Sequence, residues 1–144
     1  MDLDMREAIR QLEQLKYLRR EVDMLSQRIA ELELAAQGGV GRITGLPGGG
    51  RRMDRTGDFG AMIADLTDRL EARRTRCMEL LGALYEFIDD IDDSLLRQIF
   101  THRYIDGETW QQVAFHVGNV DEQIPRKLHN RYLQRAEIRF HGPD

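Results

Sequence analysis

Two long stretches of this 144-residue chain carry apolar residues spaced alternately three and four positions apart. In a helix this spacing lines up apolar side chains along one face, as in a coiled coil. The first stretch predicts a helix over residues 5–36, with the seam Leu15, Leu18, Val22, Leu25, Ile29, Leu32 and Ala36. The second predicts a helix over residues 58–91, with the seam Ile63, Leu66, Leu70, Arg73, Cys77, Leu80, Leu84, Phe87 and Ile91. The chain is therefore expected to be all-α.

A glycine-rich segment, residues 37–57, separates the two stretches and excludes a regular element there. Two helices of matched length around a connector predict an antiparallel coiled-coil hairpin over residues 1–91. The same seams could instead join two or more chains, so a homo-oligomer is expected. Arg73 interrupts the second seam, and a polar group there usually fixes register or partner number. The segment is either a plain connector or an arm that contacts phosphates through Arg42, Arg51, Arg52 and Arg55.

Aspartates cluster after the second helix, at positions 89, 90, 92 and 93. They predict helix capping, because aspartate favours a helix N-terminus; a metal or acid–base site is the alternative. A third helix is expected over residues 93–104, a turn over residues 105–108, and a fourth helix over residues 110–117 capped by Thr109.

Residues 109–139 have the pattern of a helix-turn-helix, which defines a second domain over residues 92–144. Ala114 supplies the small side chain needed where two helices cross, and Gly118 permits a tight turn. Ile124 and Leu128 are expected to anchor the second helix. Because proline is tolerated only in a first turn, this helix is predicted to begin near Pro125, and nearby Asp121 and Glu122 make sense as caps.

With Ile124 facing the core, Arg126, Lys127 and Asn130 fall on roughly the opposite face of the last helix. Arginine can read guanine and asparagine can read adenine, or either can hold a phosphate. Gln123 and Arg131 flank this face, and Gln111 lies at the start of the fourth helix, where exposed amides can bind phosphate. The predicted DNA-binding residues are Gln111, Gln123, Arg126, Lys127, Asn130 and Arg131. Arg135 and Arg139 are either part of this surface or simply solvated.

The net charge is −4, but residues 125–140 hold five basic residues and one acidic residue. A local basic stripe is compatible with DNA binding, because phosphate attraction acts over short distances. The four histidines show no metal-ligand spacing, and no nucleophile has a base and an orienting group in view, so no metal, cofactor or catalysis is expected. The single Cys77 and the lack of a signal segment or membrane-length apolar run favour the cytoplasm.

Residues 103–114, RYIDGETWQQVA, resemble a segment of small phage-encoded regulators with a sigma-70 region 4-like helix-turn-helix, of the RinA/ArpU type. Residues 128–131 resemble the end of their recognition helix. Residues 14–20 and 44–49 are also similar to these proteins, so the resemblance covers nearly the whole chain. The family pattern has one residue fewer after the Gly118 turn and no proline there. The resemblance implies a transcription regulator of phage or prophage late genes in a bacterial host cytoplasm, with double-stranded DNA and host RNA polymerase as partners.

Three functions are compatible with these patterns. The first is a sequence-specific regulator that uses an oligomer to meet two half-sites. The second is a DNA-packaging subunit like the small terminase proteins, which also combine a helix-turn-helix with a helical oligomerisation region. The third is a coiled-coil interaction protein that does not bind DNA.

Overall fold

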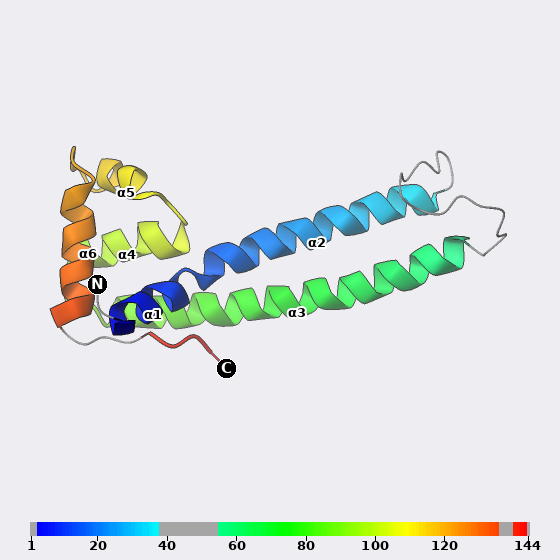
Figure 1. The fold of residues 1–144 in the computed structure, drawn as a ribbon, viewed down its shortest axis with the longest axis horizontal. Coiled ribbons are helices and arrows are strands. Elements are labelled where there is room, and N and C mark those ends of the chain that lie inside the picture. Colours follow the sequence, from blue (N-terminus) through cyan, green and yellow to red (C-terminus); the bar gives the residue numbers. More distant parts are fainter. Residues whose placement is uncertain (1–2, 38–54, 136–139, 144) are drawn as a thin grey trace. The chain divides into compact units, whose positions relative to one another are not determined.

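The computed structural model describes residues 3–37, 55–135 and 140–143, and within these ranges all regular structure is helical. The elements are α1 (Leu3–Leu12), α2 (Gln14–Ala36), α3 (Arg55–Asp89), α4 (Ser94–Phe100), the π-helical turn η1 (Thr101–Ile105), α5 (Trp110–His116) and α6 (Gln123–Arg135) (Figure 1). The chain divides into two compact units. Unit 1 comprises residues 1–19 and 76–144, and unit 2 comprises residues 20–75.

Unit 2 consists of the later part of α2 and the earlier part of α3, drawn alongside each other in Figure 1. Among the described residues of this unit, the buried apolar side chains are Ile29, Phe59 and Leu70. Arg73, the polar residue in the second seam, places its Nε 3.0 Å from Oε2 of Glu21 on α2. The interruption of the seam is therefore matched by a charge on the other helix.

Unit 1 contains a core that draws on both ends of the sequence. It joins α1 and the start of α2 to the end of α3, and these to α4, η1 and α6. Phe100 is its centre: the ring is fully buried and lies 5.8 Å from Phe87, 5.7 Å from Tyr104 and 5.6 Å from Tyr132 between centroids. The division into units therefore differs from the one expected at residue 91, because residues 1–19 and 76–91 pack with the C-terminal helices.

For the first three predicted helices, the boundaries differ from the predictions in three places. The first helix is interrupted at Glu13, between the buried Leu12 and Leu15. The second begins at Arg55, inside the segment predicted to be irregular, and ends at Asp89. The third is a short α-helix followed by a π-turn, because the amide of Asp106 donates to Thr101 O at 3.0 Å instead of closing an α-helical bond.

The capping prediction is confirmed for Asp93, one of the four clustered aspartates. Asp93 caps α4, accepting from the amide of Leu96 at 3.4 Å, and Arg97 donates to the carbonyls of Ile91 and Asp92 at the preceding turn. Residues 38–54 of the glycine-rich segment, with Arg42, Arg51 and Arg52, lie outside the described residues, and so does Arg139. In the described ranges, no helix has the length and apolar character needed to cross a bilayer.

Candidate nucleic-acid interface

The start of α5 is fixed by a reciprocal pair of hydrogen bonds. The Thr109 hydroxyl accepts from the amide of Gln112 at 3.2 Å, and the Gln112 side chain accepts from the amide of Thr109 at 2.9 Å. This capping box satisfies two amides that a helix N-terminus otherwise leaves without partners. The predicted cap at Thr109 is confirmed, and α5 ends at His116, one residue earlier than expected.

The segment between α5 and α6 is a tight reversal. Val113 and Ala114 are buried, and the amide of Asn119 donates to Ala114 O at 2.8 Å. Gly118 has φ +82°, a conformation that side chains rarely adopt. Asp121 Oδ1 then accepts from the amide of Gln123 at 2.9 Å, so Asp121 caps α6, which begins two residues before Pro125.

The buried side of α6 is formed by Pro125, His129 and Leu133, which are spaced four residues apart. Through it, α6 packs against α1, α4 and α5. The expectation that Ile124 anchors this helix is wrong, because its side chain is 45% exposed, and Leu128 is only half-buried. The proline ring takes the anchoring place instead. Proline is tolerated there because the first turn of a helix does not need its missing amide hydrogen.

His129 is the polar centre of this packing. Its ring stacks on Phe100 at 4.9 Å and meets the Trp110 ring edge-on at 4.8 Å. Nδ1 lies 2.8 Å from Oδ1 of Asn130, so Nδ1 carries the proton and Nε2 accepts from the Tyr104 hydroxyl at 2.5 Å. Burial lowers the pKa of His129 from 6.5 to about 4, although the bond to Asn130 opposes this shift. The imidazole is therefore neutral near pH 7.

The exposed side of α6 is cationic. At about 100° per residue, Lys127 lies opposite the buried stripe, with Gln123 and Arg131 beside it. The stripe runs through Pro125 rather than Ile124, so the outward face is centred on Lys127 instead of Arg126. In the part of the chain that the structure describes, Arg126, Lys127, Arg131 and Arg135 form no ion pair.

Arg126 and Asn130 lie at one edge of this face, where they line a cavity of about 230 Å³. Three more arginines line it, namely Arg6, Arg10 and Arg103. Arg103 is held in place: its guanidinium lies 4.8 Å from the centre of the Trp110 ring and 3.6 Å from Glu13 Oε1. Sequence reasoning missed these arginines because they come from α1 and η1, and only the tertiary fold brings them beside α6.

The six predicted residues thus lie on two helices, α5 and α6. Gln111, Gln123, Arg126, Lys127 and Arg131 are exposed. Asn130 is half-buried, and its side-chain oxygen is engaged by His129. Gln111 lies in the first turn of α5, whereas the other five are on α6.

No protein-family model, curated protein or solved structure matches the chain.

Proposed function

We propose that the chain binds double-stranded DNA, with α5, the reversal at Gly118 and α6 acting as a helix-turn-helix and α6 entering the major groove. One observation carries the proposal: α6 presents Arg126, Lys127, Arg131 and Arg135, none of them in an ion pair within the described residues. Cations that the protein does not neutralise are available to phosphates.

The shape of the two helices supports this proposal. The 13 residues of α6 give a length of about 20 Å, and the major groove, about 12 Å wide, admits a helix. The buried Ala114 and the left-handed Gly118 allow α5 and α6 to pack closely. The buried stripe of α6 leaves its cationic side to the solvent.

The proposal gives the exposed residues different roles. Lys127, Arg131 and Gln123, on the outward side, contact bases and the nearest phosphates. Arg126, at the edge beside Arg6 and Arg10, contacts the DNA backbone. Asn130 chiefly orients His129, because its oxygen faces that ring at 2.8 Å.

Regulation of transcription is the form of DNA binding that we favour, because residues 103–114 resemble phage late-gene regulators. The same resemblance adds host RNA polymerase as a partner. Pairing of the α2 and α3 seams between chains would form a dimer, so that two α6 helices meet two half-sites about 34 Å apart. Mass in solution tests this part separately: a dimer supports regulation, and a large ring supports DNA packaging.

A salt titration of DNA affinity tests the proposal. The wild-type protein is expected to bind duplex DNA with an affinity that falls steeply as salt rises. The double variant Lys127→Ala/Arg131→Ala should bind at least about 10-fold more weakly, and its slope of log affinity against log salt should fall by roughly 2, since each lost phosphate contact removes about 0.9.

The matched control is Arg69→Ala/Arg74→Ala, which removes the same charge from α3. These arginines lie 3.3 Å from Asp65 and 3.5 Å from Glu71, so they already have acidic partners. The control should retain wild-type affinity and slope. The absence of binding at low salt, or equal losses in the two double variants, would overturn the proposal.

A further inference from the structure

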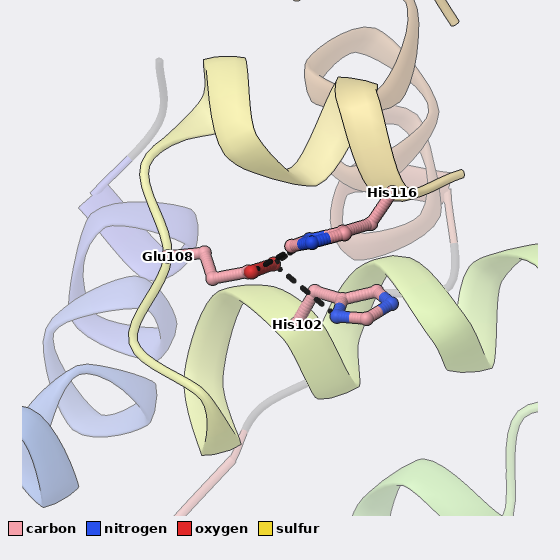
Figure 2. A group of neighbouring side chains, drawn as sticks. All are labelled: His102, Glu108 and His116. Atoms are coloured by element: carbon pink, nitrogen blue, oxygen red, sulfur yellow. Dashed lines mark hydrogen bonds and ion pairs between the residues drawn. The ribbon is translucent and has the colours of Figure 1, made fainter. Parts of the chain in front are cut away.

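Two histidines and a glutamate from separate segments converge beside α5 (Figure 2). His102 comes from η1, Glu108 from the turn after it, and His116 from the last position of α5. One ligand atom from each residue can be chosen such that all three lie within 4.8 Å of one another. Nothing in the proposed DNA contacts uses this cluster.

The distances within the cluster are close to those of a coordination sphere. His116 Nδ1 lies 2.7 Å from Glu108 Oε2, and His102 Nδ1 lies 3.2 Å from Glu108 Oε1. Ligands about 2.1 Å from a tetrahedral Zn²⁺ are separated by about 3.4 Å. Admitting an ion therefore requires the two carboxylate contacts to lengthen by about 0.7 and 0.2 Å toward this separation. It also requires the two imidazole nitrogens, which lie within 4.8 Å of each other, to come to about the same distance.

The backbone of Glu108 is held by two hydrogen bonds that do not depend on a ligand. Its amide donates to His102 O at 3.0 Å, and its carbonyl accepts from Arg103 Nη1 at 2.8 Å. Its side chain is 14% exposed, whereas that of His116 is 45% exposed. The site is thus held on the protein side and open to solvent on the other. The Asp106 carboxylate, 3.1 Å from His102 Nδ1, adds negative charge that favours a cation.

We propose that His102, Glu108 and His116 bind one Zn²⁺ ion, with water at the fourth position. Two imidazoles and one carboxylate form a ligand set that zinc accepts, whereas Mg²⁺ and Ca²⁺ prefer oxygen ligands alone. Each ring would bind through Nδ1 in its neutral form, with its proton on Nε2. The ion would tie η1 to the end of α5, and the site does not depend on whether the protein binds DNA.

Cobalt(II) titration of untagged, chelator-treated full-length protein tests this assignment, because tetrahedral Co²⁺ absorbs visible light far more strongly than the hydrated ion. Wild-type protein should bind one Co²⁺ per chain with a tetrahedral spectrum, and Zn²⁺ should displace it. His116→Gln should weaken binding by more than about 100-fold, because even residues that only support a metal ligand are worth about 10- to 100-fold.

His141→Gln is the matched control, because His141 is an exposed histidine outside the cluster. It should bind Co²⁺ as the wild type does. His116→Gln is the deciding variant, since its exposed side chain can change without loss of the fold, which circular dichroism verifies; Glu108→Gln should give the same loss. A wild-type spectrum of hydrated Co²⁺, or His116→Gln binding as tightly as His141→Gln, would overturn the assignment.

Discussion

In unit 2, arginines lie beside carboxylates that neutralise them, whereas α6 carries four cations with no ion pair in the described ranges. Arg28, Arg69 and Arg74 pair with acidic residues three or four positions away, and Arg73 pairs with Glu21 across the helices. Exposed pairs of this kind add little stability but leave little net charge. The difference indicates that the charges of unit 2 serve its own helices, while those of α6 are available to a partner.

The two units also differ in what they bury. Of the described residues in unit 2, three apolar side chains are buried and none of them completely, whereas unit 1 encloses an aromatic cluster around Phe100 and the polar His129. Because burial of apolar surface dominates folding energy, unit 1 should hold most of the stability of the chain. Substitutions in each unit test this contrast.

Phe100→Ala should have the largest effect. It removes a fully buried ring and leaves a cavity, which costs about 3–5 kcal/mol of the free energy of unfolding. Phe115→Ala removes the same group from a side chain that is 80% exposed and should change stability by less than about 0.5 kcal/mol. Urea unfolding followed by circular dichroism measures both. Similar losses would mean that the core is not centred on Phe100.

Acid should destabilise unit 1 through His129. Its folded pKa of about 4 lies below the ordinary 6.5, so the unfolded chain binds the extra proton between these values. Stability is thus fully present above pH 6.5 and is lost as pH falls toward 4, by about 3 kcal/mol in all. Urea unfolding at several pH values measures this loss.

His129→Gln should abolish this part of the pH dependence, and His141→Gln should retain it. Unit 2 contains no histidine, so the effect belongs to unit 1. An unchanged slope in His129→Gln would assign the acid sensitivity to other groups.

Tyr104→Phe should cost about 1–3 kcal/mol, because it leaves Nε2 of the buried His129 without its donor. Tyr85→Phe, at an exposed position on α3, provides the control and should be nearly neutral. Thermal unfolding compares the two variants. Equal melting temperatures would show that the hydroxyl contributes nothing to the packing of α6.

Gly118→Ala should cost roughly 1 kcal/mol, because φ +82° is unfavourable for alanine even though a Cβ there would meet no atom within 4 Å. Gly82→Ala, within α3 and equally free of contacts, should instead stabilise the protein by up to about 1 kcal/mol. Effects of the same sign on the melting temperature would contradict this account of the reversal.

Glu21→Gln in unit 2 should have the smallest effect, below about 1 kcal/mol, since both it and Arg73 are more than two-fifths exposed. High salt should reduce even this difference. A larger loss in chemical denaturation would show that unit 2 depends on its charges more than its burial suggests.

Local chemistry predicted much of the fold but not its assembly. Thr109, Asp93 and Gly118 act on their immediate neighbours, so their roles were readable from the sequence. The rotation of α6 about its axis could not be read from the sequence. Ile124 is more apolar than Pro125 and was expected to face the core, but the fold buries Pro125 instead. The convergence of His102 and His116 was also hidden, since it depends on a π-turn and on Gly107 at φ +71°.

The chain's only tryptophan, Trp110, lies where the buried side of α6 meets the rest of unit 1. Trp110 meets the His129 ring at 4.8 Å and lies beneath the Arg103 guanidinium at the same distance. When it is excited selectively over the four tyrosines, its fluorescence therefore reports on this junction without added dyes or labels. A change in emission on mixing with an oligonucleotide would show that the packing of α6 against Trp110 has changed. The same signal would follow protonation of the neighbouring His129 imidazole in real time.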